Sequence, residues 1–484
     1  MTLKGQDCLS KADVVIYDAL VNLQLLDWCK PGVPKIYVGK RGQQHANEQK
    51  EINELLIRQA TRGRQVARLK GGDPFLFGRG GEEALYLYEH DVPFEIVPGI
   101  SSASGAPTYA GIPLTDRHLG SMVTMVTGHQ GEGSQIAPVE WARISRKSTL
   151  LVFMGLEKMP LITGRLMKLN WWGDTPAVVI RWGSTYHQEI VEGTLADIAQ
   201  KAQEAKIGSP ALVVIGRVVG LRKKLRWFDT KVLFGKTVVI TRALDQAPEF
   251  ARLLEEQGAE VVSFPTIQIL PPRSWDPLDK AIASVARYDW ILFTSVNGVK
   301  GFFERLKTLG GDVRDLKGVR LGAIGPKTSG RLTQLGLKVD AFPEEYRAEA
   351  LAVVIGEVKG SRVLIARAEE ARDVLPKTLE QKGATVTIAP VYRTVKTRRA
   401  AADVKRRLLD RDADVVTFTS SSTVHGFMQH FGARQRRRIF EETKVAAIGP
   451  ITAATLREYG IRPTIHAPRY TIEALAKAIV KYYS

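Results

Sequence analysis

Hydroxyl side chains recur in the second half of the sequence, where predicted strands end and predicted helices begin. Six of them follow short apolar runs or Gly-Pro turns: Thr294, Ser295, Thr328, Ser420, Ser421 and Thr452. Such a hydroxyl can cap the helix, and the backbone N–H groups at a helix N-terminus attract anions. Capping alone explains each position in isolation. The recurrence of four such helix starts favours a bound ligand that carries several carboxylates.

The second half offers few groups for covalent chemistry. It contains no His/Asp pair, activated cysteine or glycine-rich nucleotide loop. The chain has two cysteines, Cys8 and Cys29, and its eight histidines are scattered without the spacing of metal ligands. We therefore expect no metal ion and no disulfide framework, and a site that binds and shapes its ligand.

Two loops rich in small residues lie in the first half. RLKGGDPFLFGRGGEE (residues 68–83) links a predicted strand to a predicted helix, and its glycines permit close backbone approach. It matches neither the P-loop nor the GxGxxG dinucleotide pattern. Glu82 and Glu83 at the helix start are explained by the helix dipole alone. The second loop, VPGISSASGAPTYAGIPLTDR (residues 97–117), could hold a flat cofactor against the backbone.

The elements that must position these residues alternate along the chain. Short runs rich in Val, Ile and Leu, such as ADVVIYD, PAVVIRWG, KTVVITR and DVVTFTS, alternate with helix-like stretches. This pattern is typical of an α/β protein with largely parallel sheets covered by helices on both faces. One series of strands and helices ends and another begins around residues 227–236.

The second half contains an internal repeat. KTVVITRALDQAPEFARLLEEQGAEVVSFP aligns with SRVLIARAEEARDVLPKTLEQKGATVTIAP, and Arg242 and Arg367 lie 125 residues apart in this register. So long a period predicts two duplicated lobes rather than a solenoid. PTIQILP and PVYRTVK occupy equivalent points and look like strands that cross between the lobes. Since ligands of α/β sheets bind beyond the carboxyl ends of strands, we expect the site between the lobes.

The formal net charge of +18 over 484 residues has three explanations. Nucleic-acid binding would need a basic stripe with aromatic residues, whereas the densest basic run, residues 434–438, lies in a polar helical stretch. A solvated surface or attraction of a polyanionic small substrate explains the charge better. The sequence shows no long apolar span and no secretory signal, so we expect a cytoplasmic protein without nucleic-acid or membrane partners.

Residues 236–484 resemble uroporphyrinogen-III synthase. The motifs that carry the resemblance are VVITRA, FTSVNGV, AIGPKT, PVYRT, FTSSSTV, AIGPITA and YTIEALAKAI. The resemblance implies conversion of hydroxymethylbilane to uroporphyrinogen III, with inversion of ring D and loss of water. It also implies that Thr328, Tyr392 and Thr452 line the site, with Tyr392 assisting departure of the hydroxyl group. The alternative for Tyr392 is a packing residue between the crossing strands.

Residues 1–227 resemble uroporphyrinogen-III C-methyltransferase of the tetrapyrrole methyltransferase family. The two glycine-rich loops, VIYDALV, YVGKRG, FMGL and SPALVVIGRVV carry this resemblance. It implies two methyl transfers from S-adenosyl-L-methionine to uroporphyrinogen III, giving precorrin-2. Asp18 and Lys40 match the family's proton acceptor and donor; paired strand-end charges are the alternative. The implied cofactor contacts are Gly71, Gly72, Asp73, Leu76, Ser101, Ser102, Met154, Gly183, Pro210 and Ala211.

The first half departs from the family pattern at its beginning. Family members carry a strand and a GxGPGDP-type loop just before the sequence TLKG, which here occupies residues 2–5. The strand belongs inside the first sheet, so its absence predicts unpaired backbone groups and an exposed sheet edge. Either the start is assigned too late, which we favour because the downstream motifs are intact, or this half is damaged.

The sequence thus predicts a two-lobed methyltransferase fold (residues 1–227), a linker (228–235) and a two-lobed, internally duplicated synthase fold (236–484). The leading hypothesis is a bifunctional enzyme of tetrapyrrole biosynthesis, serving siroheme or cobalamin formation, with a homodimer formed through the methyltransferase half. A second hypothesis keeps only the synthase active and makes the first half a scaffold. A third makes the duplicated lobes a ligand-sensing module.

Overall fold

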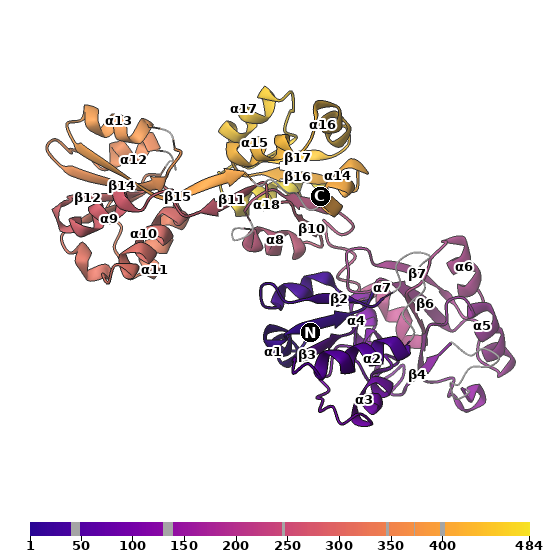
Figure 1. The fold of residues 1–484 in the computed structure, drawn as a ribbon. Coiled ribbons are helices and arrows are strands. Elements are labelled where there is room, and N and C mark those ends of the chain that lie inside the picture. The colour runs from indigo at the N-terminus through magenta and orange to yellow at the C-terminus, as the bar shows by residue number, and fades with distance from the viewer. Residues whose placement is uncertain (40–48, 129–138, 244–246, 345–347, 372, 397–401) are drawn as a thin grey trace. The chain divides into compact units, whose positions relative to one another are not determined.

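The computed structural model describes residues 1–39, 49–128, 139–243, 247–344, 348–371, 373–396 and 402–484. The chain divides into two compact units, Met1–Gly235 and Lys236–Ser484 (Figure 1). Each unit contains two β-sheets with helices packed against them. The predicted α/β class is confirmed.

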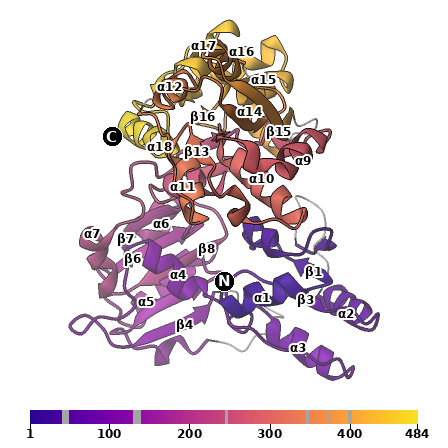
Figure 2. The same ribbon diagram turned by 90° about the vertical axis from the view of Figure 1, so that its left-hand side faces the viewer.

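The first sheet of the first unit has three parallel strands in the order β2-β1-β3. The strands and the helices around them, which we call the β1 lobe (Figure 2), are α1 (Leu3–Lys11), β1 (Val14–Tyr17), η1 (Leu23–Trp28), β2 (Lys35–Tyr37), α2 (Gln49–Ala60), β3 (Val66–Leu69) and α3 (Gly80–Tyr88). Val14, Val15 and Ile16 of the central strand are fully buried. Their β-branched side chains suit a strand that is covered on both faces.

One edge of this sheet is open in the described part of the chain. β3 pairs with β1 on one side, and no other described strand pairs with its second side. Residues 92–100, which follow α3, form no strand, although Phe94, Ile96 and Val97 are residue types common in strands. β2 and β3 are therefore the two edge strands of this sheet within the described residues.

The second sheet of the first unit is mixed, with the order β4-β5-β8-β6-β7. This β5 lobe comprises α4 (Ser102–Tyr109), β4 (Val123–Thr127), η2 (Trp141–Arg143), β5 (Thr149–Phe153), α5 (Met159–Lys168), β6 (Pro176–Arg181), β7 (Glu189–Thr194), α6 (Ile198–Glu204), β8 (Ala211–Ile215), η3 (Arg217–Leu221) and α7 (Arg222–Leu225). Only β4 and β5 pair in parallel among its described strands. The expectation of largely parallel sheets is therefore wrong here. Residues 182–188 form too short a connection between β6 and β7 for parallel neighbours.

The second unit has two five-stranded sheets, in the orders β10-β9-β16-β17-β18 and β11-β15-β14-β12-β13. The β9 lobe contains β9 (Thr237–Ile240), α8 (Pro248–Glu255), β10 (Glu260–Ser263), α14 (Ala402–Leu409), β16 (Val415–Phe418), α15 (Ser421–Gln429), α16 (Ala433–Phe440), β17 (Lys444–Ala447), α17 (Pro450–Glu458), β18 (Ile465–His466) and α18 (Ile472–Tyr483). The β12 lobe contains β11 (Ile267–Leu270), α9 (Asp276–Ala283), η5 (Val285–Arg287), β12 (Trp290–Phe293), α10 (Val296–Thr308), η6 (Val313–Leu316), β13 (Arg320–Ala323), α11 (Pro326–Gln334), α12 (Ala348–Val354), β14 (Arg362–Ala368), α13 (Val374–Gln381) and β15 (Thr385–Lys396).

The duplication yields two similar lobes, but each lobe is assembled from half of each copy. The strand order β10-β9-β16-β17 in one lobe matches β15-β14-β12-β13 in the other. Equivalent hydrogen bonds hold both sheets: the Asp414 carboxylate accepts from the Thr237 N–H at 2.8 Å, and the Asp289 carboxylate accepts from the Arg362 N–H at 2.8 Å. Each copy of the repeat therefore begins in one lobe and continues in the other.

Two strands connect the lobes. β11 pairs antiparallel with the last residues of β15, from Ile267 opposite Lys396 to Leu270 opposite Arg393. Figure 1 shows both strands running between the lobes of the second unit. The predicted crossing of PTIQILP and PVYRTVK is confirmed.

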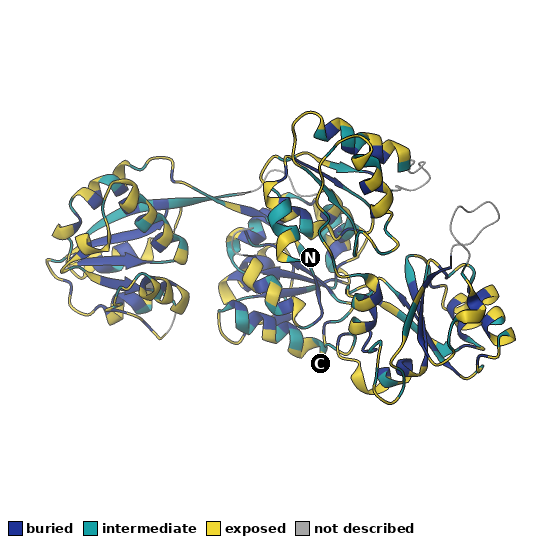
Figure 3. Ribbon diagram, turned by 90° about the horizontal axis from the view of Figure 1, so that it is seen from below, coloured by how far each residue is buried: buried dark blue, intermediate teal, exposed yellow. Residues whose placement is uncertain are grey.

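The cores of the two lobes repeat the same aromatic contact. Phe293 and Phe302 meet edge to face with ring centroids 5.5 Å apart, and Phe418 and Phe427 do so at 5.4 Å. All four rings are fully buried, and Figure 3 shows the strands as the buried layer beneath more exposed helices. The strand and the following helix are thereby fixed to each other, which sets the position of the loop between them.

Candidate active sites

The glycine-rich loop after β3 packs against the loop that follows β1. A Cβ on Gly71 would lie 2.7 Å from the carbonyl oxygen of Leu20, closer than real Cβ contacts. Gly72 has a φ of +81°, a backbone conformation that side chains rarely adopt. Glycine at position 71 thus lets the loop lie beside Leu20, two residues after Asp18, and glycine at position 72 allows the left-handed backbone that follows.

Asp73 and Ser101 join this loop to the second small-residue loop. The Asp73 carboxylate accepts hydrogen bonds from the N–H groups of Phe75 (2.9 Å) and Gly99 (3.0 Å). Ser101 caps α4 by accepting from the Ala103 N–H at 3.1 Å, and Ser102 after it is exposed. The structure therefore brings together four predicted cofactor contacts, Gly72, Asp73, Ser101 and Ser102.

Most of the remaining predicted contacts lie at strand ends of the β5 lobe, and Leu76 lies in the loop after β3. Gly183 approaches α4 so closely that a Cβ would lie 2.4 Å from the Ala106 side chain. Met154, at the end of β5, has a φ of +52° and a side chain that is 54% exposed. Ala211 follows Pro210 and pairs with Arg181 at the end of β6, and Leu76 packs against the core around α4. Gly183 and Leu76 thus lie against α4, whose start carries Ser101.

Asp18 lies directly after β1 and is held by two contacts. Its carboxylate accepts from the Leu20 N–H at 3.1 Å and forms an ion pair with Arg68 at 3.3 Å. This is the paired strand-end charge that the alternative explanation predicts, and a paired carboxylate can still accept a proton. Lys40, the predicted proton donor, lies outside the described residues.

Glu83 is a functional candidate that sequence reasoning missed. The helix dipole is a sufficient explanation for Glu82, which forms an exposed ion pair with Arg79 at 2.6 Å. Glu83 instead is buried and contacts Arg68 at 3.2 Å and Lys70 at 3.0 Å. The sequence offered only part of the signal: Arg68 and Lys70 are two residues apart at the end of β3 and can face one anion, but nothing in the spacing identifies Glu83 as that anion.

Lys70 shares this buried environment. Burial, followed by the charge of Arg68, lowers its pKa, whereas the charge of Glu83 and the hydrogen bond to Glu83 raise it. The ion pair with Glu83 thus favours the charged form of Lys70 where burial disfavours it.

In the β12 lobe, the structure brings together Ser295 and Tyr392. Ser295 caps α10 by accepting from the Gly298 N–H at 3.0 Å, and its hydroxyl lies 3.2 Å from the Tyr392 hydroxyl. Burial raises the pKa of Tyr392, and the hydrogen bond to Ser295 partly offsets this. Tyr392 also packs against the core of the lobe, so it combines a packing contact with an oriented hydroxyl. Thr294 precedes the cap and is half-buried.

In the β9 lobe, Ser420 caps α15 by accepting from the Thr423 N–H at 3.2 Å. The hydroxyl of Ser421 bonds to that of Thr455 at 2.8 Å. Thr328 and Thr452 occupy equivalent positions in the first turns of α11 and α17 and are 5% and 4% exposed. The predicted helix caps at Ser295 and Ser420 are therefore confirmed.

The predicted hydroxyl groups form two equivalent clusters, one in each lobe. Among the described residues, no hydrogen bond joins a predicted site residue of one lobe to one of the other.

Arg242 and Arg367, which mark the repeat in the sequence, also lie at equivalent strand ends. Arg367 is buried and forms an ion pair with Asp373 at 2.7 Å, which lowers the pKa of that carboxyl group. The positions of the two arginines at strand ends, in a chain with a positive net charge, were the sequence features that could have marked them as candidate site residues.

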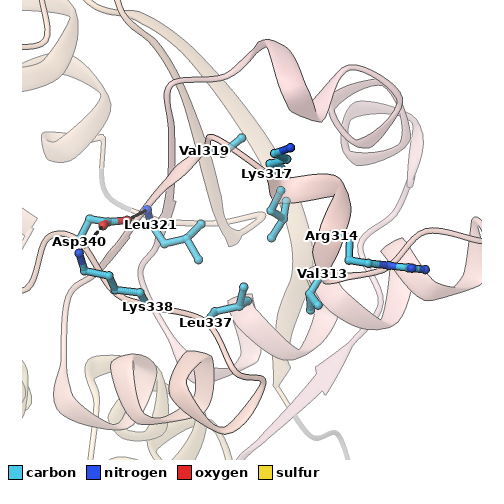
Figure 4. A pocket seen from close by; sticks show the side chains of 9 residues that line it. Val313, Arg314, Lys317, Val319, Leu321, Leu337, Lys338 and Asp340 are labelled. Carbon is cyan, nitrogen blue, oxygen red and sulfur yellow. Dashed lines mark hydrogen bonds and ion pairs between the residues drawn. The ribbon is translucent and has the colours of Figure 1, made fainter.

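A pocket of about 380 Å³ lies elsewhere in the β12 lobe (Figure 4). Leu321 and Leu337 form part of its apolar wall, and Lys317 and Lys338 lie at its rim. It lies at the amino end of β13, whereas the hydroxyl clusters lie at the carboxyl ends of strands. None of the predicted site residues lines it.

Metal ligands and membrane spans are both absent from the described residues. They contain no group of three or more His, Cys, Asp or Glu side chains that could hold a metal ion. No helix within the described ranges has the length and apolar character needed to cross a membrane.

The chain matches two protein families in succession. Residues 1–199 match Tetrapyrrole (Corrin/Porphyrin) Methylases, and residues 248–477 match Uroporphyrinogen-III synthase HemD. The porphyrin biosynthesis protein HemD of Ruminiclostridium josui is 34% identical over 483 residues, which cover 99% of this chain and 95% of that protein. The uroporphyrinogen-III C-methyltransferase of Bacillus subtilis is 36% identical over 344 residues, covering 71% of this chain and 70% of that protein.

Among solved structures, the uroporphyrin-III C-methyltransferase of Thermus thermophilus, complexed with S-adenyl homocysteine, is 36% identical. The match covers 46% of this chain and 93% of that one, with a TM-score of 0.39. The similarity to the Ruminiclostridium josui protein extends over both units and nearly the full length of each chain. The chain therefore belongs to the HemD family of porphyrin biosynthesis proteins, as a fusion of a tetrapyrrole methylase with a uroporphyrinogen-III synthase.

Proposed function

We propose that the chain converts hydroxymethylbilane to uroporphyrinogen III and then methylates this product twice, giving precorrin-2. Residues 1–227 carry the methyltransferase and residues 236–484 the synthase, with residues 228–235 as the linker. The single observation that carries the methyltransferase proposal is the row of contacts from Asp18 through Leu20, Gly71 and Gly72 to the start of α4.

The residues present fit S-adenosyl-L-methionine as the methyl donor. The loop of Gly71 and Gly72 lies against Leu20 and the start of α4, where Ser102 is exposed, and Met154 at the end of β5 is exposed as well. S-adenosyl-L-methionine would supply a methyl group on a sulfonium: the nucleophilic pyrrole carbon would bond to that methyl carbon, and the sulfur would leave as the thioether of S-adenosylhomocysteine with the electron pair of the broken C–S bond. The chain's own contribution is alignment of the two reactants, which is the main source of rate in such a displacement.

The methylated tetrapyrrole must lose a proton, and Asp18 is the group that we assign to accept it. Its carboxylate is held by the Leu20 N–H and by Arg68, so one orientation is fixed before the substrate binds. A positioned acid or base contributes about 100- to 10,000-fold to such proton transfers. Lys40 is assigned as the proton donor on the basis of the family resemblance.

In the synthase, Tyr392 is assigned to assist departure of the hydroxyl of hydroxymethylbilane by donating a hydrogen bond to it. The hydroxyl leaves as water with one added proton, which is balanced by the proton that the substrate's pyrrole nitrogen loses as the C–O bond breaks. The Ser295 hydroxyl 3.2 Å away orients the Tyr392 hydroxyl. The helix starts that carry Ser295, Thr328, Ser420 and Thr452 would bind the carboxylates of the substrate. Preorganised hydrogen bonds of this kind lower the barrier without a covalent intermediate on the protein.

The test is turnover of hydroxymethylbilane by the purified full chain, with and without S-adenosyl-L-methionine. We expect the type III ring isomer in both cases and, with the methyl donor, a product two methyl groups heavier. Chromatographic separation of the isomers and mass spectrometry measure both. If only the symmetric isomer that forms spontaneously appeared, the synthase proposal would be wrong.

The alternative function is synthase activity alone, with the first unit as a scaffold. Titration calorimetry separates the two candidates. Saturable binding of S-adenosyl-L-methionine supports the bifunctional enzyme, and no binding together with type III product supports the scaffold.

A further inference from the structure

Arg68 links the proposed proton acceptor to a buried carboxylate. Its guanidinium contacts Asp18 through one terminal nitrogen at 3.3 Å and Glu83 through Nε at 3.2 Å. The Arg68 side chain is 13% exposed and that of Glu83 is 6% exposed, so water screens neither contact strongly. A planar guanidinium that binds two carboxylates at once has little freedom to rotate.

Glu83 is itself fixed by three donors. Its Oε1 accepts from Arg68, from Lys70 at 3.0 Å and from the Gln49 amide at 3.2 Å, and Gln49 also donates to Asn53 at 2.9 Å. The donors come from β3, the residue after it and α2, while Glu83 lies in α3. The carboxylate therefore ties the two helices to the strand at the point where Arg68 leaves it.

The charges of this group balance. Two cations, Arg68 and Lys70, face two carboxylates, Asp18 and Glu83. Asp18 is the most exposed of the four, at 25%, whereas Lys70 is 10% exposed. The exposed end of the group thus carries the carboxylate that would meet the substrate, and the buried end holds it in place.

We propose that Arg68 and Glu83 are positioning residues of the methyltransferase: Glu83 fixes Arg68, and Arg68 holds the Asp18 carboxylate in the orientation that accepts the substrate proton. This inference rests on the proposed methyl transfer and adds two residues to it. Neither residue needs to touch the substrate, since both act through Asp18.

The first variant is Arg68→Lys, which keeps the positive charge. An ammonium group lacks the planar fork, so it cannot hold both carboxylates in the same geometry. We expect kcat for methyl transfer to fall about 10- to 100-fold, the effect of a small misplacement of a reacting group, with KM for S-adenosyl-L-methionine within about twofold of wild type. Arg58→Lys, on the exposed face of α2, is the matched control and should retain wild-type kcat.

The second variant is Glu83→Gln, which keeps the shape of the side chain and removes its charge. It should lower kcat similarly and leave S-adenosyl-L-methionine binding unchanged by calorimetry. The control is Glu54→Gln, an exposed position of α2. Type III isomer formation by the same preparations gives the amount of active second unit and shows that the chain is intact.

A double-mutant cycle distinguishes positioning from a merely structural role. If Arg68 acts through Asp18, Arg68→Lys should cause no further loss of kcat in an Asp18→Asn chain. A full additional loss in that background, or wild-type kcat in both single variants, would overturn the inference. Wild-type protein that makes uroporphyrinogen III without methylating it would instead contradict the proposed methyltransferase function, and the inference with it.

Discussion

At the scale of single residues, Tyr392 is the side chain of the synthase with the clearest chemical role. Removing its hydroxyl in Tyr392→Phe should lower synthase kcat about 10-fold without abolishing turnover. The helix N-termini and the other hydroxyl groups also contribute to lowering the barrier. Rate measurements with hydroxymethylbilane test this, with Tyr482→Phe, an exposed tyrosine of α18, as the control. Complete loss of turnover would show that catalysis is concentrated in Tyr392.

The protonation of Tyr392 gives a prediction about pH. Burial raises its pKa above the ordinary value of 10.0, so the hydroxyl keeps its proton through the neutral and mildly alkaline range. A raised pKa in an acid means that the neutral, donating form is lost only as pH rises past that value. The wild-type synthase rate should therefore show no falling limb from this group below about pH 10. A Tyr392-dependent fall near pH 8, absent in Tyr392→Phe, would contradict the assignment.

Gly71 shows how one missing side chain sets the geometry of a site. In Gly71→Ala the new Cβ would meet the Leu20 carbonyl oxygen at 2.7 Å, so the loop must shift. We expect the free energy of unfolding of the first unit to fall by about 1–3 kcal/mol. Six of the eight tryptophans lie in residues 1–235, so tryptophan fluorescence during urea unfolding reports mainly on this unit.

Gly81 is the matched control for this loop. It lies in α3, and a methyl group added there would meet no atom within 4 Å beyond its chain neighbours and the backbone of its own helix. Gly81→Ala should therefore leave stability unchanged or raise it by up to about 1 kcal/mol. Equal destabilisation by both substitutions would mean that loop contact with Leu20 is not the reason for glycine at position 71.

At the scale of elements, the start of α15 allows helix capping and substrate binding to be separated. Aspartate caps helices as well as serine does, but its charge would repel a substrate carboxylate. In Ser420→Asp we therefore expect unchanged stability and a KM for hydroxymethylbilane raised about 10-fold or more, equivalent to about 1.4 kcal/mol. Thr471→Asp at the N-cap of α18, which is not a predicted site residue, should leave KM unchanged. An unchanged KM in Ser420→Asp would leave capping as the sole role.

The elements also show what could be predicted from sequence and why. The repeat, the crossing strands and the caps at Ser295 and Ser420 depend on local patterns, which the sequence displays directly. The exchange of halves between lobes depends on which strands pair over long distances, as when Thr237 of β9 bonds to Asp414. The network around Glu83 was missed for the same reason, because its donors come from strands and helices that sequence spacing does not relate.

At the scale of the whole molecule, the net charge of +18 should assist capture of an anionic substrate. Salt screens such attraction beyond about 10 Å at roughly 0.1 M ionic strength. KM for hydroxymethylbilane should therefore rise several-fold between about 0.01 and 0.3 M salt, while kcat stays constant. KM for S-adenosyl-L-methionine, which carries a positive charge, is the internal control and should not rise. If KM for hydroxymethylbilane did not change with salt, the net positive charge would serve only to keep the surface solvated and would not attract the substrate.

The exchange of half-repeats has a consequence for ancestry and for biogenesis. A polypeptide carrying one copy would hold two incomplete sheets, and it could complete them only by trading halves with a second molecule. Fusion of such an intertwined pair into one chain would give the present strand orders. During synthesis, β9 must then wait for its neighbour β16, since 177 residues separate Thr237 from Asp414. The nascent second unit therefore exposes unpaired strand edges for longer than a chain with sequential lobes would, which is where chaperones would be needed.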